Sequence, residues 1–317
     1  MPATNGLILA LGGNALIGAG EEKSIPQQYR RAEETLRRIL PLVEQHQHVL
    51  IVHGNGPQVG NELLRSEIAE AQLFPLPLDV LVADCQGVMG YLLQQALANL
   101  MAEQGIERSV LTIVTQVVVA EDDPAFASPS KPVGGFLSEE QAGEEKRRGW
   151  DVVEDAGRGW RRVVPSPQPL QVVELEGIRA MYESGAIVLA AGGGGIPVVR
   201  KGPRLEGIEA VIDKDNVTAL LAGELKPVRL VMLTAVDELH IGHATPDERS
   251  LGEVDAAELR EHYRAGEFSR GSMGPKVACV LSYLEGASDV DGRSALITSP
   301  EALGEALAGR AGTKVRP

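Results

Sequence analysis

Three short apolar runs, each ending at or next to glycine, restrict the fold of this chain more than any other feature. The runs are residues 6–11, 48–52 and 187–191. The glycines at their ends are Gly12 and Gly13, then Gly54 and Gly56 after His53, then Gly192, Gly193, Gly194 and Gly195. Ligands of open α/β sheets bind beyond the carboxyl ends of the strands, where glycine lets the backbone approach closely. The sequence therefore predicts one pocket bordered by three glycine turns.

Helical and strand patterns alternate along the chain. Apolar runs predict strands at 6–11, 48–52, 110–119, 187–191, 228–234 and 294–298. Helical spacing predicts helices at 29–45, 59–72, 79–104, 172–184, 215–225, 255–265, 275–285 and 300–307, the third of them long or interrupted near Gly87 or Gly90. Strands that are apolar throughout and alternate with helices indicate an α/β fold with a largely parallel sheet covered on both faces.

Residues 121–169 differ in composition from the rest of the chain. Prolines, glycines and charges dominate there, and both tryptophans, Trp150 and Trp160, fall in this segment. Apolar and polar residues alternate around 159–164, as in a strand with one buried face. We interpret the segment as an inserted subdomain of hairpins that projects from the main sheet and has a small core of its own.

Charge and composition exclude several classes of partner. The 317 residues carry a formal net charge of −14, which disfavours nucleic acid and anionic membranes as partners. Aromatic residues make up only 3%, too few for a base-stacking surface. No apolar run approaches the roughly 20 residues that a membrane span needs. The two cysteines, Cys85 and Cys279, form no metal-binding or redox pair, so we expect a reduced, cytoplasmic protein. An anionic substrate would need a local positive pocket.

Three lysines could form such a pocket. Lys214 lies between Asp213 and Asp215 where a helix opens, Lys276 lies near the start of another helix, and Lys131 lies next to a proline. A helix N-terminus and a lysine together suit a phosphate group. Solvated lysines and a mobile glycine loop are the alternative. The Walker and dinucleotide-binding motifs are absent, and no set of histidines, cysteines and carboxylates has metal-ligand spacing, so no metal held by the protein alone is predicted.

Six segments resemble the carbamate kinases, a branch of the amino acid kinase family. They are residues 10–15, 53–60, 154–161, 192–197, 210–215 and 271–273, and the resemblance covers essentially the whole chain in order. It implies one domain over residues 1–317, an open three-layer αβα sandwich with a mainly parallel sheet, and a homodimer. The implied reaction is reversible phosphoryl transfer between ATP and carbamate, giving ADP and carbamoyl phosphate. Mg²⁺ would be carried with the nucleotide, and the resemblance leaves the physiological direction open.

The resemblance also implies roles for individual residues. Lys131, Lys214 and Lys276 would stabilise the transferring phosphoryl group, and Asp215 would orient the lysines. Gly12, Gly13, Asn14, Gly54, Asn55, Gly56 and the four glycines from Gly192 to Gly195 would line the substrate and phosphate pocket. Thr234, Ala235, Val236, Asp237, Met273 and Gly274 would border the nucleotide. Many amino acid kinases carry a lysine where this chain has Ala10, and Lys131 from the insert would replace it.

Two other functions remain open at this point. The acceptor could be another small acid, although the match of the insert and of Lys131 disfavours this. The fold could also serve a nucleotide-sensing protein without catalysis, although the presence of all three lysines with Asp215 disfavours that.

Overall fold

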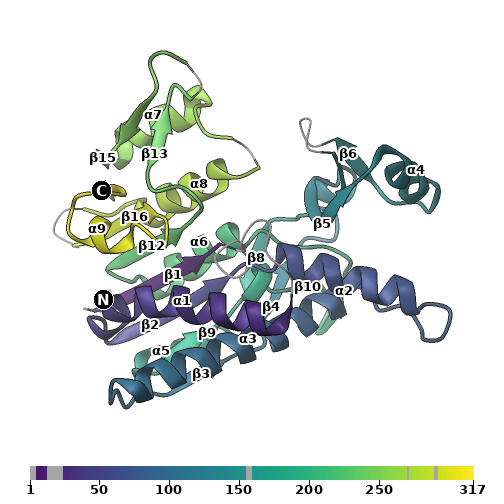
Figure 1. Ribbon diagram of the computed structural model, residues 1–317, viewed down its shortest axis with the longest axis horizontal. Coiled ribbons are helices and arrows are strands. Elements are labelled where there is room, and N and C mark those ends of the chain that lie inside the picture. The colour runs from purple at the N-terminus through teal and green to yellow at the C-terminus, as the bar shows by residue number, and fades with distance from the viewer. Residues whose placement is uncertain (1–4, 13–23, 155–158, 244, 270, 289–291) are drawn as a thin grey trace.

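The computed structural model describes residues 5–12, 24–154, 159–243, 245–269, 271–288 and 292–317. Its centre is an eight-stranded sheet (Figure 1). In spatial order the strands are β15 (Glu253–Asp255), β17 (Thr313–Arg316), β16 (Ser294–Thr298), β12 (Arg229–Leu233), β1 (Gly6–Leu11), β2 (His48–His53), β9 (Ile187–Leu189) and β3 (Val110–Thr112). All neighbours pair in parallel except β16 and β17. The predicted, mainly parallel sheet is confirmed.

The sheet is covered on both faces because its strands are apolar on both faces. Along β1, Ile8 and Ala10 pack into one buried cluster, whereas Leu7 and Leu9 pack into a second. The first cluster contains side chains of α5 (Leu175–Glu183), α6 (Lys214–Leu225), α7 (Ala256–Ala265) and α8 (Met273–Leu284). The second contains side chains of α1 (Ile25–Glu44), α3 (Leu78–Glu103) and α9 (Leu303–Leu307). This arrangement is the three-layer αβα sandwich that the resemblance implied.

The long helix α3 is not interrupted. Gly87 and Gly90, where a break was considered, both lie inside its 26 residues. A side chain at position 90 would collide with the side chain of Thr112 on β3, so glycine here allows the helix to pack closely on the edge strand. Helix α2 (Gly56–Ala69), which precedes α3 in the chain, begins three residues before the predicted start at residue 59. It has a proline in its first turn.

The predicted strand at 110–119 is wrong as a single element. Residues 110–112 form β3 in the main sheet, but β4 (Gln116–Val119) belongs to a second sheet with β11 (Arg204–Gly207), β10 (Ile196–Lys201) and β8 (Pro169–Val172). Between them, the buried side chain of Gln86 hydrogen-bonds the backbone N–H and C=O of Thr115. The same carbonyl also accepts from the backbone N–H of Ile196 at the start of β10, so Thr115 lies where the chain leaves the main sheet for the second one. The sequence reasoning also missed β10, β11, β15, β17 and the hairpin of β13 (Leu239–Ile241) and β14 (Arg249–Leu251).

A third sheet projects from the molecule above α2 (Figure 1). It consists of β5 (Lys131–Leu137), β7 (Trp160–Val164) and β6 (Val152–Glu154), with helix α4 (Glu139–Arg147) against them. The 3₁₀ turn η2 (Pro124–Phe126) precedes it. A helix thus accompanies the predicted hairpins. The boundaries of the insert at 121 and 169 stay a prediction.

A close backbone approach and an ion pair help to attach this projecting sheet to α2, beside a shared apolar cluster. A side chain at Gly60 of α2 would overlap the backbone of Gly134 in β5, so glycine at this position allows the two segments to approach closely. The buried Arg162 donates to Glu67 of α2 over 2.7 Å, and it also pairs with Glu145. Its guanidinium lies 4.1 Å from the ring centroid of Trp150. The start of β5, which carries Lys131, is therefore held against the main domain.

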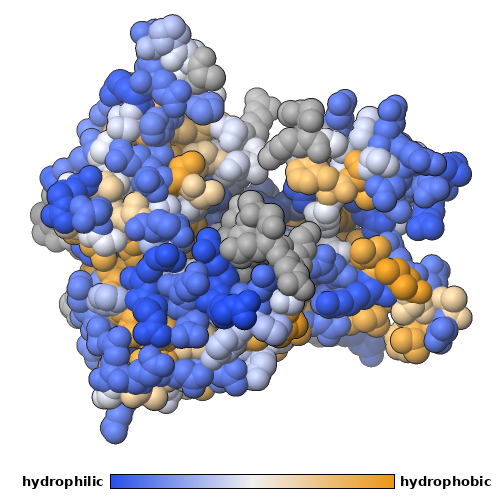
Figure 2. Space-filling view, in the orientation of Figure 1, coloured by the Kyte–Doolittle hydropathy of each residue, from blue (hydrophilic) through white to orange (hydrophobic). Residues whose placement is uncertain are grey.

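The face shown in Figure 2 is mainly hydrophilic and is hollowed between the projecting sheet and the part that contains α7 and α8. None of the helices in the described ranges is long and apolar enough to span a membrane.

Candidate active site

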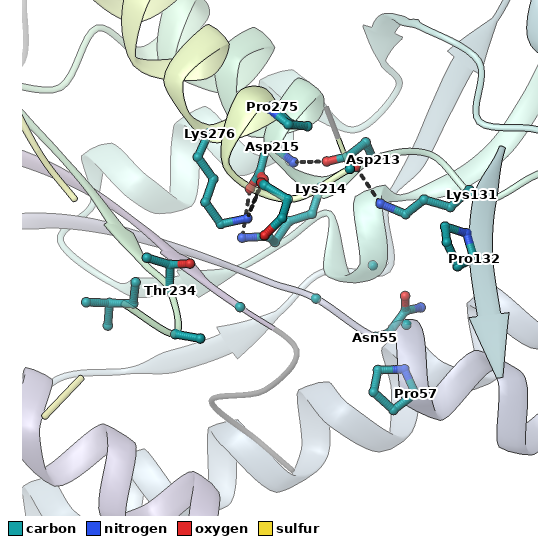
Figure 3. A pocket seen from close by; sticks show the side chains of 18 of the residues that line it. Asn55, Pro57, Lys131, Pro132, Asp213, Lys214, Asp215, Thr234, Pro275 and Lys276 are labelled. Carbon is teal, nitrogen blue, oxygen red and sulfur yellow. Dashed lines mark hydrogen bonds and ion pairs between the residues drawn. The ribbon is translucent and has the colours of Figure 1, made fainter. Parts of the chain in front are cut away.

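A cavity of about 570 Å³ lies at the carboxyl ends of β1, β2 and β12, between the start of β5 and the starts of α6 and α8 (Figure 3). Because these three strands are parallel, their ends meet at one edge of the sheet. Five basic residues line the cavity, namely Arg31, Lys131, Arg161, Lys214 and Lys276, together with three acidic ones, Asp213, Asp215 and Glu301. The chain as a whole carries −14, so the excess of positive charge here is local.

Asp215 holds two of the lysines. The Nζ of Lys276 donates to its Oδ2 over 3.0 Å, and the Nζ of Lys214 lies 2.9 Å from its Oδ1 (Figure 3). Burial raises the pKa of the Asp215 carboxyl, but the two ammonium groups outweigh burial and bring the pKa down to about 2. Asp215 is therefore ionised at neutral pH. Its single charge faces two positive charges, which leaves the cluster able to accept an anion.

Local sequence explains where these groups lie. Asp213 caps α6, because its Oδ1 accepts from the backbone N–H of Asp215 over 2.9 Å. The helix therefore begins at Lys214, and both Lys214 and Asp215 lie in its first turn. Only 8% of Lys214 and 3% of Asp215 are exposed. Buried charges are costly unless paired, so the ion pair between neighbours keeps both groups charged in the wall of the cavity.

Lys131 reaches the same cavity from the projecting sheet. Its Nζ pairs with Oδ2 of Asp213, and Figure 3 shows its side chain pointing from β5 toward α6. The three lysines that the resemblance selected, which come from segments far apart in the sequence, thus lie around one cavity. The wall opposite contains Asn55 and Gly56, with Pro57, at the start of α2 (Figure 3). Gly12 and Gly54 line the cavity as well, whereas Gly13 and Asn14 lie outside the described residues.

The four-glycine turn supports the cavity more than it lines it. Of the four, only Gly193 borders the cavity, and a side chain there would overlap Asn55. The N–H groups of Gly194 and Gly195 donate within the turn, to Ala191 and Gly192. A side chain at Gly194 would meet the backbone carbonyl of Ile212. These two N–H groups therefore already have partners within the turn. The turn allows close packing behind Asn55 and Asp213.

Comparison with known proteins gives the family. The sequence profile of the amino acid kinase family matches residues 5–292. The chain belongs to the amino acid kinase family.

Several proteins similar to this amino acid kinase over nearly its full length are carbamate kinases. The chain is 44% identical to the carbamate kinase of Thermococcus kodakarensis over 98% of both chains. It is 45% identical to that of Clostridium perfringens over 98% of this chain and 99% of the other. Among solved structures, carbamate kinase from Giardia lamblia bound to AMP-PNP superposes with a TM-score of 0.88, at 37% identity and with 99% of both chains covered. The chain is therefore a kinase, that is, a phosphotransferase.

The residues expected to border the nucleotide divide into two groups in this amino acid kinase. Thr234 and Ala235 follow β12 and line the cavity, but Val236, Asp237, Met273 and Gly274 do not. Near the last two, the lining residues are instead Gly271, Ser272 and Pro275. A sequence motif predicts a range of neighbouring residues. The direction of the backbone at each residue then decides which of them faces the cavity.

Several lining residues were not predicted as site residues. They are Arg31, Thr35, Pro57, Pro132, Val133, Arg161, Val211, Ile212, Asp213, Leu233, Gly271, Ser272, Pro275, Pro300 and Glu301. Some of these were within reach of sequence reasoning, because Asp213 and Arg161 belong to the segments that carry the resemblance. Arg31 and Thr35 had no such signal, since they lie on α1 away from any glycine turn.

His53, at the end of β2, is a buried residue that packs against the glycine turns, and it does not act as an acid–base group. Its ring packs where a side chain at Gly192 would be, and its Nδ1 lies 3.2 Å from the carbonyl oxygen of Gly54. Its pKa is lowered from 6.5 to about 4, mainly by burial, while the hydrogen bond with Gly54 opposes the shift and the positive charge of Lys214 adds to it. The imidazole is therefore neutral at neutral pH.

This pKa predicts an acid-sensitive stability. The unfolded chain binds a proton near pH 6.5 and the folded chain only near pH 4, so acidification favours unfolding. Between about pH 7 and pH 4, His53 should remove about 3 kcal/mol of the free energy of unfolding. Urea unfolding at both pH values should show this loss in the wild type and lack it in His53→Gln. An equal pH dependence in the two proteins would contradict the assignment.

Proposed function

We propose that this kinase is a carbamate kinase, which transfers a phosphoryl group reversibly between ATP and carbamate. The observation that carries the proposal is the meeting of Lys131, from the projecting sheet, with Lys214 and Lys276 in one cavity. The full-length similarity to carbamate kinases supports the acceptor.

The chemistry needs positioning and charge more than it needs a base. A carbamate oxygen is already anionic, so it can attack the γ-phosphorus of ATP without losing a proton. The new bond joins that oxygen to the phosphorus, while the bond from the phosphorus to the bridging oxygen of ADP breaks. Negative charge spreads over the three equatorial oxygens, where lysine ammonium groups stabilise it. The three lysines supply this charge, which fits a site whose histidine is buried and neutral.

The acceptor would bind on the α2 side of the cavity. Asn55 is 2% exposed, and its Nδ2 has no hydrogen-bond partner among the described residues. A buried amide of this kind is costly unless a ligand satisfies it, so we assign it to carbamate or to the phosphoryl oxygens. The backbone at Gly12, Gly54 and Gly56 would border the same space. The nucleotide would lie toward Thr234 and Ala235, with Val236, Asp237, Met273 and Gly274 beside it.

Mg²⁺ would be held by the nucleotide. Asp213 and Asp215, two carboxylates of the cavity, already pair with lysines. In the described part of the chain, no group of three or more histidines, cysteines and carboxylates could hold a metal ion. A metal that arrives on the phosphates of ATP and keeps several waters would fit this cavity. It would neutralise charge on the β- and γ-phosphates.

The test is ATP formation from ADP and carbamoyl phosphate with Mg²⁺, followed by a coupled hexokinase assay. We expect turnover, with carbamoyl phosphate strongly preferred over acetyl phosphate. Preference for another acyl phosphate would assign a different small acid as acceptor, and tight ATP binding without any turnover would indicate a nucleotide sensor. We also propose a cytoplasmic homodimer, as in the resemblance, which light scattering coupled to gel filtration would test.

A further inference from the structure

Asp213 makes two contacts from one carboxylate. Its Oδ1 accepts from the backbone N–H of Asp215 over 2.9 Å and so caps α6. Its Oδ2 pairs with the Nζ of Lys131. The side chain of Asp213 is 20% exposed and that of Lys131 is 29% exposed, and both residues line the cavity. One acidic group therefore connects the start of α6 to the projecting sheet.

The contact with Lys131 decides where that ammonium group lies. A lysine side chain has four rotatable carbons and no fixed direction of its own. The other attachments of the projecting sheet, at Gly60 and at Arg162, fix the backbone of β5 and β7 but do not touch Lys131. An ammonium group has three N–H donors, so one can go to Asp213 while the others stay available for a phosphoryl group.

We propose that Asp213 is a positioning residue that holds Lys131 over the transferring phosphoryl group, as Asp215 holds Lys214 and Lys276. This role rests on the proposed function. The two acidic residues, which flank Lys214 in sequence, then position all three lysines from one helix start. The similarity assigned this task to Asp215 alone, and nothing in the sequence pairs Asp213 with a residue 82 positions away.

Asp213→Asn separates the two contacts of this carboxylate. Asparagine is as good a helix cap as aspartate, so α6 should keep its start and the thermal unfolding midpoint should change little. The ion pair with Lys131 is lost, and we expect kcat to fall roughly ten- to hundredfold while KM for ADP changes little, because a misplaced catalytic group affects the transition state. Asp213→Ser, which also caps, should behave in the same way. Asp255→Asn is the matched control, because the side chain of Asp255 also caps a helix, α7, by accepting from the backbone N–H of Glu258, and Asp255 does not line the cavity.

A double-mutant cycle with Lys131→Ala tests whether Asp213 acts through Lys131. If Asp213 acts through Lys131, Asp213→Asn should cause no further loss of kcat in the Lys131→Ala protein. It should even restore some activity, since a bare carboxylate facing the phosphoryl group repels it. If Asp213→Asn lowers kcat by the same factor in both backgrounds, Asp213 acts through α6 instead. If it does not lower kcat in the wild-type background, Asp213 has no role. Either result overturns the proposal.

A second measurement does not depend on turnover. Acetic anhydride should acetylate Lys131 faster in Asp213→Asn than in the wild type, as mass spectrometry of the peptide would show, because the ion pair shields the amine. An unchanged rate would overturn the pairing. The wild-type assay separates the two proposals: a chain without carbamoyl phosphate turnover refutes the proposed function, whereas an active chain with additive losses refutes only the role of Asp213.

Discussion

Replacing Lys131 with alanine is expected to lower kcat about 10²–10³-fold, which is the usual loss when one preorganised donor to developing negative charge is removed. The physical reason is that Lys131 supplies one of the three ammonium groups around the cavity. Among the described lysines that line the cavity, it is the one that the projecting sheet contributes. Its loss leaves Asp213 unpaired in the wall, so the net positive charge of the cavity falls. Steady-state kinetics with ADP and carbamoyl phosphate would measure the change.

The fold should survive this substitution. Lys131 is partly exposed, lies at the first residue of β5, and is absent from the buried clusters, so the thermal unfolding midpoint should stay close to that of the wild type. Lys146→Ala is the matched control, because Lys146 belongs to the same projecting part, lies 4.4 Å from the ring of Trp160, and does not line the cavity. Normal turnover in Lys131→Ala would contradict its role, and an equal loss in Lys146→Ala would point to a disturbed insert.

Much of the main sheet could be predicted because its strands are buried on both faces. Runs such as 6–11 and 230–233 are apolar throughout, a pattern that fits few other structures in a chain with regular helices between the runs. The run at 110–119 is also rich in valine and isoleucine, and at its break Thr115 bonds Gln86, a residue on a helix distant in sequence. Short strands such as β13 and β15, with three residues each, are too short for a periodic signal.

The site was predictable mainly through resemblance. Residue patterns alone could place glycines at the strand ends, since parallel strands bring their carboxyl ends together. They could not show that the N–H groups of Gly194 and Gly195 donate to carbonyl oxygens of their own turn, because glycine serves close packing and anion binding equally well. Nor could they show the pairing of Lys131 with Asp213, because nothing local in a sequence encodes a contact between a projecting sheet and a helix start.

Replacing Asp215 with asparagine should lower both stability and activity. At neutral pH the carboxylate, which is only 4% exposed, stabilises the fold because its pKa is about 2 in the folded protein and 3.8 in the unfolded chain. This depressed pKa alone corresponds to about 2 kcal/mol, and the two lysines left without a counter-charge add to the loss, so we expect about 2–4 kcal/mol in urea unfolding. The contribution is present above about pH 4 and disappears as the pH falls toward 2, so the variant should lack that part of the acid transition.

Stability and catalysis should respond differently when a lysine is then removed. In Asp215→Asn combined with Lys276→Met, one of the two uncompensated charges is gone, so part of the lost stability should return. Turnover should fall further, because a group that neutralises the phosphoryl oxygens is missing as well. Recovery of both properties together would mean that Asp215 serves only to keep the lysines compatible with burial. Recovery of stability without turnover would show that the same ion pairs that allow two lysines to be buried also aim them at the phosphoryl group.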